Sequence, residues 1–150
     1  MTDVLTPEQR RKNMSNIKGR NTAPERILRS LLFGEGYRFR LHDKNLPGCP
    51  DIVLKRYRAV IFVHGCFWHR HQGCRFAATP KSNIEFWAAK FTANQARDSR
   101  VIGQLIELNW NVIIVWECQI KTLQKDGITS LDNILNLCAS MENAQLYEID

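Results

Sequence analysis

The chain has 150 residues, of which 44% are hydrophobic, and it carries a formal net charge of +6. This length suits one domain with its own hydrophobic core, and we predict a single domain over 1–150. No apolar run is long enough to span a membrane and the N-terminus has no signal-peptide profile, so we expect a cytoplasmic protein.

Basic side chains crowd the first thirty residues. They are Arg10, Arg11, Lys12, Lys18, Arg20, Arg26 and Arg29. Such clustering favours an anionic partner, with nucleic acid first, although an inert solvated basic face remains the alternative. Thr6, Pro7 and Gln9 are typical of a helix start, which predicts a basic helix over 6–18 that contacts DNA.

A second helix is predicted over residues 23–33, opened by Thr22 and Pro24 and given an apolar stripe by its leucines. Glu25 falls at the margin of that stripe, which holds its carboxylate near the body of the fold. The same position is where a capping-box glutamate belongs, and Glu25 can serve in both ways.

Three strands are predicted next. Residues 37–41 alternate apolar and polar, as in a half-buried strand, and after a loop residues 51–55 and 59–64 form an antiparallel hairpin. Turn lengths of two to five residues place Asp51 opposite a position between Phe62 and Gly65.

That hairpin brings possible ligands for Mg²⁺ together. A carboxylate from Asp51 can meet a backbone carbonyl and the imidazole of His64, while water and phosphate oxygens take the remaining positions. A nearby histidine can then accept a proton from the attacking water. The alternative is that Asp51, which follows a proline, is only a turn residue at the strand entry.

Cysteines and a histidine suggest a second metal. Cys66, His71 and Cys74 are close in sequence, and Cys118 follows a predicted strand that can return to the same place. Such a set suits a closed, structural zinc site, whereas buried free thiols are the competing interpretation. We expect Cys49 and Cys138 to be free thiols.

The remaining elements complete an α/β fold. A long helix over 82–108 opens with Ser82 and Glu85 as a capping box, and Asn109 suits a left-handed cap. The continuous apolar run 112–115 predicts a central strand buried on both faces, and a terminal helix lies near 130–141. Together they predict a mixed sheet flanked by helices.

Several short motifs carry a family resemblance that spans about residues 10–120. They are Asn13-Met14, Asn21-Thr22-Ala23-Pro24-Glu25, Pro50-Asp51, His64-Gly65-Cys66-Phe67-Trp68-His69, Glu85-Phe86-Trp87 and Trp110 to Trp116-Glu117-Cys118. With them the chain resembles the very-short-patch repair (Vsr) DNA mismatch endonucleases. The resemblance implies a restriction-endonuclease-like fold and a Mg²⁺-dependent nick on the 5′ side of the thymine in T:G mismatches, which arise when 5-methylcytosine deaminates.

The resemblance also implies residue roles. Asp51 and the Val63 carbonyl would hold Mg²⁺, His69 would activate water, and Glu25 and His64 would support the reaction. Structural Zn²⁺ would be held by Cys66, His71, Cys74 and Cys118. Phe67, Trp68 and Trp87 would wedge into the base stack, with Met14 entering from the minor groove. Apart from the resemblance, Lys90 of the predicted long helix is a basic side chain available to contact a DNA phosphate.

We expect double-stranded DNA with a T:G mismatch as substrate, a monomeric enzyme associated with the nucleoid when it acts, and mismatch-repair machinery with a cognate cytosine-5 methyltransferase as partners. Two rivals remain: a zinc-stabilised DNA-binding protein without catalysis, and a restriction-type endonuclease that cuts paired DNA.

Overall fold

The computed structural model describes residues 6–9, 11, 21–140 and 142–149, and within them five strands form one mixed sheet. In sheet order they are β1 (Arg40–Leu41), β2 (Ile52–Leu54), β3 (Ala59–His64), β4 (Asn111–Trp116) and β5 (Leu146–Ile149). The pairs β1–β2 and β2–β3 are antiparallel, whereas β3–β4 and β4–β5 are parallel. The predicted α/β class and mixed sheet are confirmed.

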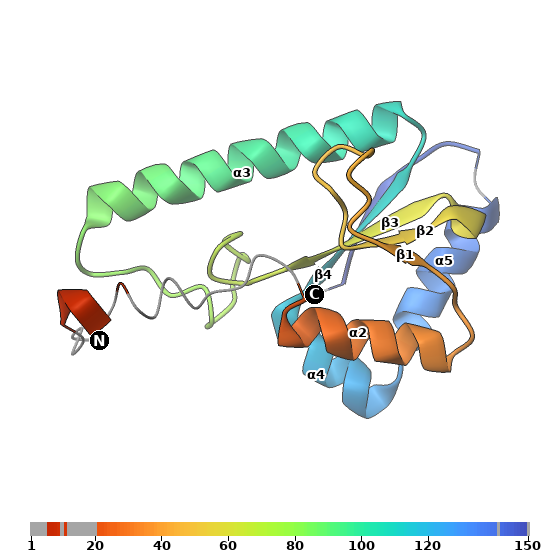
Figure 1. The fold of residues 1–150 in the computed structure, drawn as a ribbon, viewed down its shortest axis with the longest axis horizontal. Helices are drawn as coiled ribbons and strands as arrows, with labels where there is room; N and C mark the ends of the chain where they lie inside the picture. The colour runs from red at the N-terminus through yellow and green to blue at the C-terminus, as the bar shows by residue number, and fades with distance from the viewer. Residues whose placement is uncertain (1–5, 10, 12–20, 141, 150) are drawn as a thin grey trace.

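Helices cover both faces of this sheet. They are α2 (Ala23–Gly34), α3 (Ile84–Glu107), α4 (Glu117–Asp126) and α5 (Thr129–Ser140). The long helix α3 lies on one side of the sheet, and α2, α4 and α5 lie on the other (Figure 1). In the described part of the chain, no helix is both long and apolar enough to cross a membrane.

Successive side chains on the central strands point to opposite faces and so build two hydrophobic clusters. Ile113 and Val115 pack with the leucines of α2 and α5, while Val112 and Ile114 pack against Leu105 of α3. All six residues of β4 are buried. The prediction of a central strand covered on both faces is confirmed, because β4 lies between β3 and β5 and its side chains enter both hydrophobic clusters.

The two predicted N-terminal caps are present. The Thr6 backbone N–H donates to Gln9 Oε1 at 2.9 Å and the Gln9 N–H donates to Thr6 Oγ1 at 3.1 Å, a reciprocal capping box. Thr22 caps α2 by accepting from the Glu25 N–H at 3.4 Å. Most of the predicted helix over 6–18, including Met14, lies outside the described residues.

The predicted strand over 37–41 is too long. Only Arg40 and Leu41 pair with β2, because residues 37–38 bond to the end of α2 instead. The Tyr37 N–H donates to the Leu32 carbonyl, and the Arg38 guanidinium donates to the Phe33 carbonyl. These bonds cap the carbonyl end of the helix at the expense of the ladder.

The start of α3 also differs from the prediction. Its N-cap is Asn83 in the left-handed conformation, without a side-chain cap bond, so the Ser82–Glu85 capping box is wrong. The predicted left-handed cap at its other end is confirmed, since Asn109 has φ 64°. Helix α4 and strand β5 were not predicted; the charged sequence of α4 and the short length of β5 give weak periodic signals.

Candidate active site and metal centre

Asp51 lies where the hairpin register was expected to place it. Ile52 pairs with Ile61, so Asp51 is beside Phe62 and Val63, and Asp51 Oδ2 accepts the Val63 N–H at 2.8 Å. Burial raises the Asp51 pKa to about 7, with the Val63 N–H opposing the shift and the Glu25 carboxylate adding to it. A nearby divalent cation would offset this cost of ionisation.

Glu25 reaches the same region from α2. Its side chain is buried, and Oε2 accepts from the Asn21 N–H and from Arg29 Nη2, both at 3.0 Å. His42 bridges the two carboxylates: Nε2 lies 3.7 Å from Glu25 Oε2 and Nδ1 lies 4.0 Å from Asp51 Oδ1. Glu25, His42 and Asp51 thus offer ligand atoms within 4.8 Å of one another, close enough to hold a metal ion.

Two histidines form the opposite side of the candidate site. The rings of His64, at the end of β3, and His69 are stacked with centroids 3.8 Å apart. His69 Nδ1 lies 2.6 Å from Asp98 Oδ2 on α3. The Asp98 carboxylate accepts a hydrogen bond from Nδ1–H, which leaves Nε2 as the unprotonated, basic nitrogen. Burial lowers the His64 pKa to about 3, with the neighbouring His69 adding to the shift, so His64 is neutral at pH 7.

One cleft of about 840 Å³ joins these groups. Its wall comes from α2, from the strand ends of the hairpin and from α3. Among the lining residues are Glu25, His42, Asp51, Val63, His64, Trp68, His69, Lys90, Asn94, Arg97 and Asp98. Carboxylates for a cation, a histidine with a free ring nitrogen and basic side chains therefore open onto the same space, an arrangement suited to hydrolysis of a phosphodiester.

A separate cluster of Cys66, His71, Cys74 and Cys118 offers ligand atoms within 4.8 Å of one another. His71 Nδ1 lies 3.6 Å from Cys66 Sγ and 3.4 Å from Cys118 Sγ. Burial raises the pKa of the Cys66 thiol, so a thiolate there requires a cation. Cys118 follows β4 as Cys66 follows β3, and His64 pairs with Trp116 across these parallel strands, which brings the distant Cys118 to the cluster.

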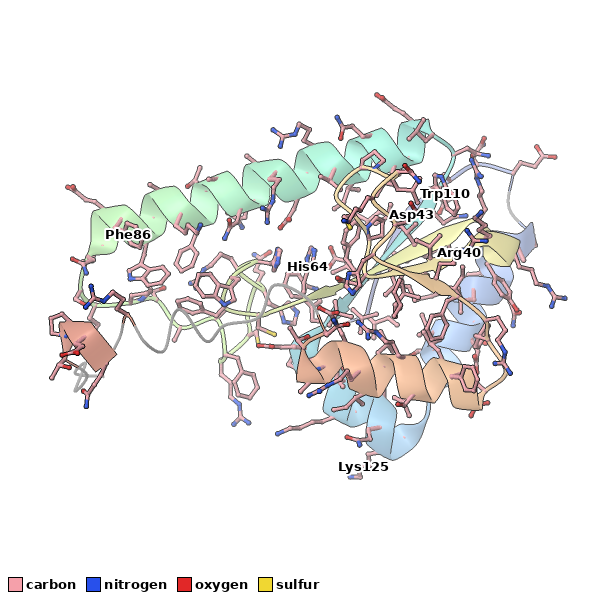
Figure 2. The ribbon with its side chains drawn as sticks, in the orientation of Figure 1. Arg40, Asp43, His64, Phe86, Trp110 and Lys125 are labelled. Carbon is pink, nitrogen blue, oxygen red and sulfur yellow. The ribbon has the colours of Figure 1, made fainter. Side chains whose placement is uncertain are left out.

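Aromatic rings gather beside the cleft. The Phe67 ring lies 5.3 Å from Trp68, 5.4 Å from Trp87 and 5.2 Å from Phe91, measured between centroids. The Phe86 ring lies 5.3 Å from Trp87, and its side chain is 61% exposed. Figure 2 shows Phe86 near the first turn of α3, far along the helix from the sheet, whereas His64 lies near the centre of the molecule.

The structure places the nominated residues that it describes in three groups, namely the cleft, the cysteine–histidine cluster and the aromatic cluster. It also adds residues that sequence reasoning missed. Asp98 was missed because no motif surrounds it; the signal was its helical spacing of four from Asn94 and eight from Lys90. His42 was missed because its closeness to Asp51 depends on pairing between β1 and β2: the His42 N–H donates to the Asp51 carbonyl at 3.4 Å. Met14 lies outside the described residues.

Known proteins resemble this chain along most of its length. The model of the family "DNA mismatch endonuclease Vsr" matches residues 2–75. A type II nicking enzyme, V.XorIIP of Xanthomonas oryzae, is 52% identical over 82% of this chain and 90% of its own length. DNA mismatch endonuclease Vsr of Escherichia coli is 45% identical over 97% of this chain and 94% of its own. A type II nicking enzyme, V.NmeAIP of Neisseria meningitidis, is 44% identical over 81% of this chain and 86% of its own length.

The mixed sheet carries an acidic, histidine-rich cleft with the residue types of a metal-dependent nuclease, a class of hydrolase. The identities above fix which one: the chain belongs to the Vsr family of DNA mismatch endonucleases. It is therefore a DNA endonuclease, which excludes the non-catalytic DNA-binding alternative.

Proposed function

We propose that this endonuclease nicks one strand of duplex DNA on the 5′ side of the thymine in T:G mismatches that arise from deaminated 5-methylcytosine. The observation that carries the proposal is the shared cleft, where Asp51 and the His69–Asp98 pair face the same space. An aromatic cluster at its edge supplies the means to recognise a weakened base step.

Asp51 and the Val63 carbonyl would hold Mg²⁺. Both fit the ion's preference for oxygen ligands, and the raised Asp51 pKa marks a carboxylate whose ionisation a cation would favour. When bound, the ion supplies Lewis acidity to the phosphate and stabilises the developing charge. His42 lies between Asp51 and Glu25 and restrains both side chains, and Glu25 would support the reaction.

His69 would act as the general base through Nε2. The bond from Nδ1 to Asp98 fixes the tautomer and stabilises the imidazolium that forms when the water proton is taken. His64, neutral and stacked on His69, restrains the ring plane and can hydrogen-bond to the substrate without adding a second positive charge.

Zn²⁺ would occupy the Cys66–His71–Cys74–Cys118 cluster. A tetrahedral zinc bonded to sulfur at about 2.3 Å and nitrogen at about 2.05 Å places those two atoms about 3.6 Å apart. The observed distances of 3.4 and 3.6 Å from His71 Nδ1 to two sulfurs fit that geometry. The closed four-ligand set makes the site structural, and it anchors the loop that carries Phe67 and Trp68.

Phe67, Trp68 and Trp87 would insert beside the mismatch, with Met14 entering from the minor groove and Lys90 contacting a phosphate. Unstacking costs less at a mismatched step than in paired DNA, so the wedge favours mismatches. We further propose that the enzyme acts as a monomer on nucleoid DNA in the cytoplasm, together with mismatch-repair machinery and a cognate cytosine-5 methyltransferase.

A nicking assay with Mg²⁺ tests the proposal. Labelled duplexes would carry T:G mismatches in many flanking contexts, each with a paired control, and Asp51→Ala would serve as the inactive variant. We expect a nick on the thymine strand of mismatched DNA only, lost in Asp51→Ala. Equal cutting of both strands of paired DNA would instead favour the restriction-type alternative.

A further inference from the structure

Arg70 lies between Cys66 and His71, inside the loop that carries three residues of the cysteine–histidine cluster. Its backbone has φ 57°, and its guanidinium reaches across the loop to the segment that leads into α3. Nη1 donates to the carbonyls of Phe67 at 3.4 Å and Ala78 at 3.2 Å. Nη2 donates to the Ala77 carbonyl at 2.9 Å and to Thr79 Oγ1 at 3.2 Å.

These contacts use all four N–H groups of the two terminal nitrogens, since each nitrogen carries two. An arginine beside a proposed DNA-binding surface ordinarily contacts a phosphate. Arg70 instead donates its hydrogen bonds to protein oxygens, and hydrogen bonds from a charged donor are stronger than neutral ones. Its charge therefore serves to fix the loop.

The same guanidinium lies against the aromatic cluster. Its central carbon is 4.2 Å from the centroid of Phe91 and 5.7 Å from that of Phe67, both within cation–π range. Phe91 is buried on α3, while Phe67 contacts Trp68 and Trp87. Arg70 thus ties the Phe67 turn to the helix that carries Trp87.

We propose that Arg70 is a positioning residue that sets mismatch discrimination by holding the Phe67–Trp68–Trp87 wedge rigid before DNA binds. The inference rests on the proposed function of that wedge. A preorganised wedge loses little conformational entropy on insertion, and it must unstack a base step in order to dock. A mobile wedge can move out of the base stack, so paired DNA binds without being unstacked. The preference for mismatched over paired DNA then falls.

Arg75 provides a matched control in the same loop. It carries the same charge, is exposed, and its guanidinium lies 4.7 Å from the ring centroid of Phe76, which is not part of the wedge. Replacing Arg75 therefore removes one positive charge from the loop without loosening the wedge.

The test compares Arg70→Lys, Arg70→Met and Arg75→Met with wild type. Lysine keeps the charge but lacks the planar fork that bridges several carbonyls. For each protein we would measure zinc content, kcat/KM on a T:G duplex and on its paired control, and the fluorescence of a 2-aminopurine beside the mismatch in magnesium-free buffer. That probe brightens when its base is unstacked.

Both Arg70 variants should retain zinc yet lose at least about tenfold in the ratio of mismatched to paired kcat/KM, about 1.4 kcal/mol of discrimination, with a smaller 2-aminopurine signal. Arg75→Met should keep the wild-type ratio. Wild-type discrimination in Arg70→Lys, an equal loss in Arg75→Met, or failure of both Arg70 variants to fold would overturn the inference. If wild type itself shows no preference for mismatched DNA, the proposed function fails instead.

Discussion

His69 Nδ1 lies 2.6 Å from Asp98 Oδ2, so a carboxylate on α3 orients the ring of a histidine that belongs to a loop after β3. Only the packing of α3 across the sheet makes this pair, because 29 positions separate the two residues along the chain. The pair links the cleft to the helix that also carries Trp87 and Lys90.

Asp98→Asn should slow nicking roughly 10–100-fold, because an amide does not stabilise the imidazolium as a carboxylate does and can select the wrong tautomer. The loss should appear in the single-turnover rate constant, with little change in DNA affinity. Asp126→Asn, at the exposed end of α4, is the control and should match wild type. An unchanged single-turnover rate constant in Asp98→Asn would contradict the role given to the pair.

Asp51→Asn should abolish nicking and yet stabilise the protein in magnesium-free buffer with zinc retained. Asparagine keeps the acceptor for the Val63 N–H and removes a buried charge beside Glu25. The advantage should be on the order of 3 kcal/mol at pH 8, measured as the difference in the free energy of unfolding.

The sign of its pH dependence follows from the raised Asp51 pKa. The folded state holds the proton up to about pH 7, whereas the ordinary value is 3.8, so wild-type stability falls as pH rises through that window. The difference between Asp51→Asn and wild type should therefore grow from pH 4 to 7 and then level off. A difference that stays constant over this range would show that burial does not perturb Asp51.

Cys74→Ser should lower zinc content and reduce Tm by roughly 10 °C, because the proposed zinc would contribute folding free energy to the loop that it closes. Cys49→Ser is the matched control, since Cys49 is a half-buried free thiol outside the cluster. Metal analysis and thermal unfolding would measure the two effects. Full zinc content in Cys74→Ser would remove Cys74 from the ligand set.

His42→Ala should raise the Mg²⁺ concentration needed for half-maximal nicking by roughly 3–10-fold, about 1 kcal/mol. The ring lies between Glu25 and Asp51, and its loss leaves both carboxylates less constrained. Saturating Mg²⁺ should restore most of the rate. His42→Gln, which preserves a polar side chain, should show a smaller shift; an unchanged Mg²⁺ dependence in both variants would separate His42 from the cation site.

The sequence by itself determined several local elements and the residue types of the site, although it missed α4 and β5. Thr6–Gln9 and Thr22 cap their helices as expected, the continuous apolar run of β4 is central, and the hairpin brings Asp51 to Val63. Each depends on contacts within or between adjacent elements, where spacing in the chain limits the geometry.

Only the tertiary structure decided which distant groups meet. The Asp98 bond to His69 and the bridging of two carboxylates by His42 depend on helix packing and on strand pairing. The span from Arg70 to Ala77, Ala78 and Thr79 depends on an irregular loop. Neither periodicity nor spacing encodes such contacts, because they arise from how separate elements bury their apolar faces together.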